Sequence, residues 1–287
     1  MLGNCKYMSK VKSVIKWSII LVCSLLLLLA ISIFISENCL SVTYYEYNNK
    51  KIREPFTVVQ ISDLHNHEFG KSNRRLIDKI AKEQPDVIFM TGDMLNDDEC
   101  RTDLIENLVK ALKDVAPVYF SLGNHEKQYM KQDARLISKL EDAGAVVLDK
   151  DYLDTNINGQ EIRIAGVYGY VLDWESGDGT EQRFMEEFEG TDRFKILLSH
   201  IPEGLLLWKS MEYWDVDLIF SGHVHGGQIR LPFIGGLYDP EEGYLPTYTK
   251  GKFACGNSTM ILSAGLGTSG NIPRVNNLPE IVVCQIQ

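Results

Sequence analysis

Short hydrophobic runs alternate along most of the chain with segments in which hydrophobic residues recur at helical spacing. Runs at 57–61, 87–90, 118–122, 195–199 and 218–221 are typical of buried strands, and further runs at 146–148 and 162–167 predict two more. Helical spacing appears at 72–84, 102–114, 136–143 and, more weakly, 182–188. Strands that alternate with helices predict an α/β fold.

One hydrophobic run is much longer than the others. Residues 17–36 contain no charge, and their number matches the roughly 20 apolar residues that cross about 30 Å of hydrocarbon as a helix. The alternative is a cleaved signal peptide, but the run exceeds the roughly 7 to 15 residues of the apolar core of a typical signal peptide, and no small-residue cleavage site closes it. Four lysines precede the run and Glu37 follows it, which favours a cytoplasmic N-terminus.

The pattern divides the chain into four parts. We expect a basic cytoplasmic N-terminus at 1–16, a transmembrane helix at 17–36, a juxtamembrane segment at 37–55 and one globular domain at 56–287. Within the juxtamembrane segment, the polar stretch near 44–54 is expected to be a hairpin or linker. The domain would then lie outside the cytoplasm, held to the cell membrane by a single helix. Six scattered cysteines without a C-x-x-C pair argue against a structural zinc knuckle or a disulfide framework.

Net charge narrows the choice of partners. The whole chain carries −10 and residues 1–36 contribute +4, so the remainder carries −14. A domain this acidic is repelled by the phosphate backbone of nucleic acid. We therefore expect no nucleic-acid partner and do not favour a nuclease.

Five of the hydrophobic runs end in residues that can bind a metal. These residues are Asp63, Asp93, the pair Asn124 and His125, His200, and His223. In open α/β sheets, ligands collect outside the carboxyl ends of the strands, so such residues converge although they are far apart in sequence. His65 and His225 each follow a strand-end residue by two positions, and residues at that spacing share one face of an extended segment.

The resulting set of candidate ligands is too large for one ion. It comprises Asp63, His65, Asp93, Asn124, His200, His223 and His225. A tetrahedral zinc takes four ligands, whereas two ions that share one carboxylate would use the whole set. Imidazole and carboxylate ligands suit manganese, iron, zinc and cobalt. The sixth histidine, His67, is expected to be an ordinary polar residue.

The order of these blocks resembles a known family. The blocks Asp63-x-His65, Gly92-Asp93, Gly123-Asn124-His125-Glu126, His200 and Gly222-His223-x-His225 are similar to the motif series of the calcineurin-like metallophosphoesterases. The resemblance covers roughly residues 56–287. The later segments 226–228, 273–274 and 278–281 resemble the bacterial membrane-associated YkuE/YaeI-like branch. The resemblance implies two β-sheets packed face to face between helices.

The same resemblance implies roles for the residues. One metal would be held by Asp63, His65 and His225, the other by Asn124, His200 and His223, with Asp93 bridging. A metal-bound hydroxide would attack phosphorus, and His125 would stabilise the transition state or protonate the leaving alkoxide. Family members often carry a carboxylate three residues after the bridging aspartate, where it orients the catalytic histidine; this chain has Asn96 there, with Asp97 beside it.

The sequence thus predicts a membrane-anchored phosphoesterase with two divalent metal ions. Its substrates would be phosphomonoesters or phosphodiesters, lipid-linked ones included. One alternative is a pyrophosphatase acting on a membrane nucleotide-sugar lipid, and another is a non-catalytic, metal-stabilised binding domain on the cell surface. The apolar stretch 205–208, with Met211 and Trp214, is expected to be a core helix rather than a lipid-docking surface.

Overall fold

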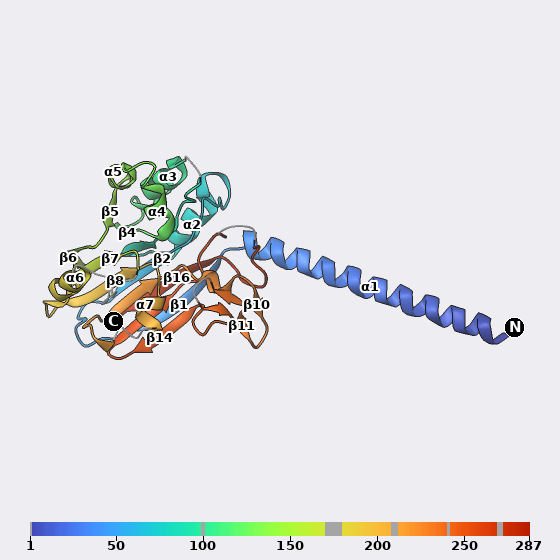
Figure 1. Ribbon diagram of the computed structural model, residues 1–287. Helices are drawn as coiled ribbons and strands as arrows, with labels where there is room; N and C mark the ends of the chain where they lie inside the picture. Colours follow the sequence, from blue (N-terminus) through green and yellow to red (C-terminus); the bar gives the residue numbers. More distant parts are fainter. Residues whose placement is uncertain (1, 99–100, 170–179, 208–211, 240–241, 269–271) are drawn as a thin grey trace.

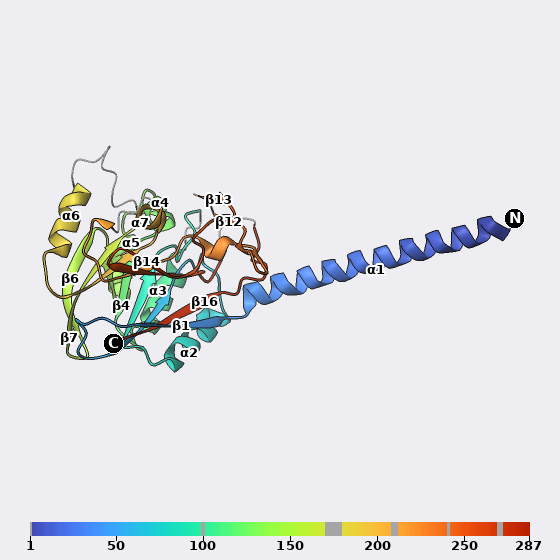
Figure 2. The ribbon, with the colours of Figure 1, turned by 90° about the horizontal axis from the view of Figure 1, so that it is seen from below.

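The computed structural model describes residues 2–98, 101–169, 180–207, 212–239, 242–268 and 272–287. Helix α1 (Leu2–Asn38) projects from the rest of the molecule as a long rod (Figures 1 and 2). Its part from Lys10 to Asn38 is long and apolar enough to cross a membrane. A membrane span and a signal sequence share these properties, so the membrane helix and the four-part division of the chain stay predictions.

Two six-stranded sheets form the centre of the described part of the chain after α1. The first has the spatial order β1 (Ser41–Tyr47), β16 (Glu280–Ile286), β2 (Phe56–Ile61), β3 (Val87–Thr91), β4 (Val118–Ser121) and β5 (Ala145–Leu148). The second has the order β14 (Gly251–Cys255), β15 (Ser258–Leu262), β9 (Leu218–Ser221), β8 (Phe194–Ser199), β7 (Gln160–Val167) and β6 (Asp151–Ile157). The neighbours β2 to β5 are parallel, and so are β7, β8, β9 and β15.

The sheets pack face to face because the central strands are apolar on both faces. In β2, Val58 packs between the sheets whereas Val59 faces the outer helices. In β3, Phe89 points inward, where its ring meets that of Phe220 from the second sheet at 5.2 Å between centroids. This two-sided burial explains why these strands are continuous hydrophobic runs in the sequence.

Helices cover the outer face of each sheet (Figure 1). The first sheet is covered by α2 (Arg74–Lys82), α3 (Asp103–Leu112) and α5 (Leu136–Ala143), and the second by α6 (Thr180–Glu189) and α7 (Glu203–Leu206). Leu205 and Trp214 belong to the core beneath the second sheet, as expected for a core segment; Trp208 and Met211 lie outside the described residues. The predicted architecture of two stacked sheets between helices is confirmed.

The main difference from the sequence-based expectation lies just after α1. Residues 41–47 lie in the juxtamembrane segment and overlap the expected hairpin or linker, yet they form β1, an edge strand parallel to β16. The partly buried and exposed residues of this strand do not alternate regularly, and its neighbour comes from the far end of the chain, so no local pattern predicts it. Two short hairpins, β10 (Arg230–Leu231) with β11 (Gly235–Gly236) and β12 (Tyr238–Asp239) with β13 (Gly243–Tyr244), complete the fold.

Candidate metal centre

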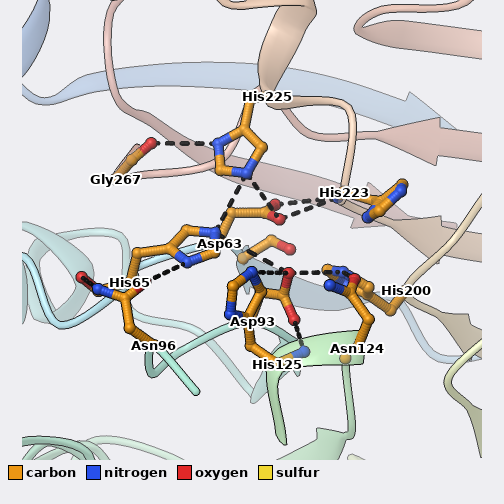
Figure 3. A network of polar contacts seen from close by, with 12 residues as sticks. Asp63, His65, Asp93, Asn96, Asn124, His125, His200, His223, His225 and Gly267 are labelled. Atoms are coloured by element: carbon orange, nitrogen blue, oxygen red, sulfur yellow. Dashed lines mark hydrogen bonds and ion pairs between the residues drawn. The ribbon is translucent and has the colours of Figure 1, made fainter. Parts of the chain in front are cut away.

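The strand-end residues of both sheets meet at one place (Figure 3). Asp63 and Asp93 follow the neighbouring strands β2 and β3, and Asn124 begins α4 (Asn124–Tyr129) after β4. His200 follows β8, and His223 comes shortly after β9. The carboxyl ends of parallel strands in each sheet therefore deliver these side chains to a shared site, as the sequence predicts.

The backbone at the site is bent rather than extended. Five of the candidate residues have positive φ angles: Asp63 at 53°, His65 at 49°, Asp93 at 53°, His223 at 75° and His225 at 49°. The expectation that the two Asp/His-x-His pairs share a face of an extended segment is therefore wrong, although each residue does reach the site. Non-glycine residues in the left-handed region, where φ is positive, destabilise the folded chain by about 1 to 3 kcal/mol each, and such residues cluster at functional sites.

Asp63, His65 and His225 form the first group of candidate ligand atoms, which all lie within 4.8 Å of one another. His65 Nε2 lies 3.1 Å from His225 Nε2, and His225 Nε2 lies 3.6 Å from Asp63 Oδ1. The other ring nitrogens face acceptors, since His65 Nδ1 contacts Asn96 Oδ1 at 2.9 Å and His225 Nδ1 contacts the carbonyl of Gly267 at 3.2 Å. Each Nδ1 therefore carries the proton, and two Nε2 lone pairs face one another.

Burial keeps these imidazoles neutral and suited to bind a cation. It lowers the pKa of His65 to about 4 and that of His225 well below its usual value. Burial also raises the pKa of Asp63 to about 6. A nearby cation would oppose that rise, because it favours the charged carboxylate.

Asp93, His200 and His223 form the second group, with Asn124 beside it. His200 Nε2 lies 3.1 Å from both Asp93 Oδ2 and Asn124 Oδ1, while its Nδ1 donates to the Thr91 carbonyl at 2.8 Å. The Nε2 atom of His223 is buried and has no hydrogen-bond partner among the described residues. A buried, unpaired ring nitrogen that points into a polar cluster indicates a ligand atom.

Asp93 occupies the centre of the arrangement. Its Oδ2 lies 3.1 Å from His200 Nε2 in one group and 3.9 Å from His65 Nε2 in the other. Burial alone would raise the pKa of Asp93, but the charge and hydrogen bond of His200 outweigh it and lower this pKa. The same attraction overcomes burial at His200 and raises its pKa to about 10. Asp93 thus stays ionised between the two groups.

His125 lies at the exposed rim of the site. Its Nε2 is 4.0 Å from Asp93 Oδ2 and its Nδ1 is 2.7 Å from Asp97 Oδ1. Asp97 therefore supplies the carboxylate partner that the family pattern would place at Asn96, and Asn96 orients His65 instead. His125 also lies close enough to His65 and Asp93 to count as a third group of ligand atoms. Its partial exposure and its Asp97 partner set it apart from the buried histidines.

Glu126 is a buried residue of the site, and its role cannot be predicted from the sequence. Its carboxylate accepts the backbone N–H groups of Asp93 at 2.7 Å, Met94 at 2.8 Å and Gly123 at 2.8 Å. It thereby joins the turn after β3 to the turn after β4. Burial raises the pKa of Glu126 to about 7. The motif block contains this glutamate, but only the folded chain shows that it holds two turns together. His67, by contrast, packs on Phe69 outside both ligand groups.

Gly123→Ala should disrupt the centre. A Cβ atom at this position would lie 2.2 Å from Asp93 Oδ1 and 2.5 Å from the Asp93 nitrogen. Because a displacement of about 1 Å can cost 10²-fold in rate, we expect the rate of any reaction catalysed at this centre to fall at least that far. Gly190→Ala, whose Cβ would meet nothing closer than 3.4 Å, is the matched control. Full activity in Gly123→Ala would contradict this packing.

Comparisons with known proteins agree with this geometry. Residues 56–227 match the family model described as calcineurin-like phosphoesterase. The uncharacterized metallophosphoesterase YkoQ of Bacillus subtilis is 28% identical over 239 residues, which cover 82% of this chain and 84% of YkoQ. YkuE of the same species is 29% identical over 234 residues, 79% of this chain and 78% of YkuE.

One further relative and one solved structure extend the comparison. The phosphodiesterase YaeI of Escherichia coli is 26% identical over 237 residues, 81% of this chain and 82% of YaeI. Among solved structures, a 5′-nucleotidase precursor from Thermus thermophilus superposes with a TM-score of 0.51 at 16% identity, covering 81% of this chain and 54% of that one. That likeness supports the fold alone. The family model spans more than half of the chain and every candidate ligand, so this protein belongs to the calcineurin-like phosphoesterase family and is a metallophosphoesterase, a hydrolase acting on phosphate ester bonds.

Proposed function

We propose that the site holds two divalent metal ions that share Asp93. One ion would be bound by Asp63, His65 and His225, and the other by Asn124, His200 and His223. The observation that carries this assignment is that two groups of candidate ligand atoms share no residue, Asp63 with His65 and His225, and Asp93 with His200 and His223, each with its atoms within 4.8 Å of one another. The third group, His65 with Asp93 and His125, links these two.

The protonation pattern supports cations at both places. The Nε2 atoms of His65 and His225 cannot donate to each other, because each ring carries its proton on Nδ1. The Nε2 atom of His223 lacks a described partner. Leaving such groups unsatisfied costs about 1 to 3 kcal/mol each, and a bound cation removes that cost. Imidazole, carboxylate and amide donors suit manganese, iron, zinc or cobalt.

Each part of the site would have its own task in hydrolysis. Divalent ions supply Lewis acidity and lower the pKa of bound water toward neutrality, which makes a hydroxide nucleophile available. Asp93 aligns the two halves of the site. His125 would carry a proton on Nε2 to the leaving oxygen, while Asp97 accepts the Nδ1 proton of the same ring and fixes its orientation.

The substrate would be a phosphomonoester or a phosphodiester. The relative YaeI is named as a phosphodiesterase, which supports testing diesters first. We further propose that α1 anchors the protein in the cell membrane as a single span with a cytoplasmic N-terminus, so that the enzyme acts outside the cytoplasm. Four lysines before the apolar run support this orientation.

Metal removal tests this function. After chelation, we expect the detergent-solubilised full chain to lose turnover of both p-nitrophenyl phosphate and bis(p-nitrophenyl) phosphate, and to regain it with Mn²⁺, Fe²⁺, Zn²⁺ or Co²⁺. Elemental analysis should find two ions per chain. The preferred ester separates monoesterase from diesterase. Undiminished turnover in metal-free protein would refute the proposal, and so would two bound ions with no turnover of monoesters, diesters or pyrophosphates.

A further inference from the structure

The domain is held close to the end of α1. Only Cys39 and Leu40 separate the last residue of α1 from the first residue of β1, so the two elements are joined by at most about 10 Å of chain. The helix is also bound laterally, since the backbone N–H groups of Asn276 and Asn277 contact the hydroxyls of Ser32 at 3.0 Å and Ser36 at 3.2 Å. A membrane that surrounds the last turns of α1 would therefore also contact this end of the domain.

An exposed apolar hairpin tip lies at the same end. Figure 1 shows β10 and β11 on the side of the domain from which α1 leaves. Asn276 connects the two elements, because its side-chain amide donates to the Arg230 carbonyl at 3.0 Å while its backbone contacts Ser32. The hairpin turns at Phe233 and Ile234, whose exposures are 107% and 64%. A fully exposed aromatic ring beside an aliphatic side chain is unusual on a surface that meets only water.

Cationic side chains flank the helix at this end as well. Arg75 Nη2 donates to the carbonyl of Asn38, and Lys79 Nζ donates to the carbonyl of Leu40, each at 2.9 Å. Helix α2 carries four basic residues and one acidic residue, whereas the chain after residue 36 carries a net −14. Helix α2 is thus net basic within a domain that is acidic overall, and two of its cations contact the chain at the end of α1, an arrangement that complements an anionic membrane surface.

From these contacts we propose that this end of the domain is a docking face for an anionic lipid bilayer. We define the docking face by Phe233 and Ile234 of the hairpin and by Arg75 and Lys79 of α2. The two apolar side chains enter the bilayer beside α1, and the two cations lie among the headgroups. The proposal rests on the membrane anchor described under the proposed function, but not on catalysis.

Docking of this kind would set the metal centre near the lipid headgroups. The turn at His225–Gly227 directly precedes the hairpin, and the N–H of Leu237, just after β11, donates to the Gly227 carbonyl at 3.2 Å. The base of the hairpin and a ligand-bearing turn are therefore one connected unit. Phosphate esters at the membrane surface are the substrates that this arrangement would favour.

Photocrosslinking in vesicles tests the docking face. The full chain is placed in vesicles of phosphatidylglycerol and phosphatidylethanolamine with Phe233→benzoylphenylalanine, and illumination is followed by mass spectrometry. Leu26→benzoylphenylalanine, at an exposed position within α1, is the positive control, and Val146→benzoylphenylalanine, exposed on the opposite edge strand β5, is the negative control. We expect one lipid adduct at positions 233 and 26 and none at 146. Replacing phosphatidylglycerol by phosphatidylcholine should lower the yield at 233 several-fold and leave that at 26 unchanged.

Three other outcomes would contradict the docking face, each for a different reason. A lipid adduct at position 26 without one at 233 overturns the docking face and leaves the anchor intact. A crosslink from 233 to a second protein chain assigns the hairpin to a protein partner instead. Absence of lipid adducts at both positions refutes the anchor, and the docking face with it. Because the measurement does not use turnover, a failure of the catalytic proposal would leave these results unaffected.

Discussion

Asp93→Asn should lower turnover by at least about 10³-fold. The Asp93 carboxylate lies between the two groups of ligand atoms, with Oδ2 3.1 Å from His200 Nε2 and 3.9 Å from His65 Nε2. An asparagine has nearly the same shape, but it is uncharged and offers one carbonyl oxygen in place of two. Two-metal sites supply several kcal/mol of transition-state stabilisation, and each 1.36 kcal/mol is tenfold in rate.

The measurement is kcat for the preferred chromogenic ester together with metal content. We expect Asp93→Asn to bind fewer than two ions per chain at the metal concentration that saturates the unaltered protein. Asp142→Asn, which removes an exposed carboxylate on α5, is the control for loss of a charge alone. If Asp93→Asn kept both ions and most of its activity, the carboxylate would not be the shared ligand.

His125→Asn should lower kcat by about 10²- to 10⁴-fold, the range expected when a general acid is removed. His125 is separated from the buried ligands by its place at the rim and by its contact with Asp97. The variant should therefore retain two bound ions. The loss should also depend on the leaving group, since an ester of an alcohol needs a proton on the departing oxygen more than an ester of nitrophenol does.

A pair of substrates separates this role from a structural one. We expect His125→Asn to lose more activity toward an alkyl phosphate ester than toward the matching nitrophenyl ester. Asp97→Asn should show the same leaving-group trend with a smaller loss, because it weakens only the orientation of the ring. Equal losses on both esters would show that His125 acts on the metal site or on binding rather than on the leaving oxygen.

The part of the fold that the sequence predicts is the part built from local patterns. Strands β2, β3, β4, β8 and β9 are continuous hydrophobic runs because both faces of each are buried, and α5 ends at Gly144, whose φ of 108° suits glycine. Strand β1 cannot be predicted from a local hydrophobic pattern. Its partner β16 lies more than two hundred residues away, and that pairing, not the hydrophobic pattern of residues 41–47, makes it a strand.

The candidate site likewise has some features that the sequence predicts and others that depend on the folded chain. The motif residues converge because parallel strands bring their carboxyl ends to one edge, which the order of the runs implies. Their backbone conformations cannot be predicted from the residue spacing. Asp63 and His65 have positive φ angles instead of the extended geometry expected for them. The task of Glu126 also depends on folding, because it accepts N–H groups from two turns that are thirty residues apart in the chain.

The most direct test of the account is anomalous diffraction from crystals of the protein grown with Mn²⁺. We expect two anomalous peaks about 3.5 to 4 Å apart, with the carboxylate of Asp93 between them. One peak should contact Asp63, His65 and His225, and the other Asn124, His200 and His223. A single peak, or two peaks that leave either set of residues without contact to a metal, would contradict the shared-carboxylate centre.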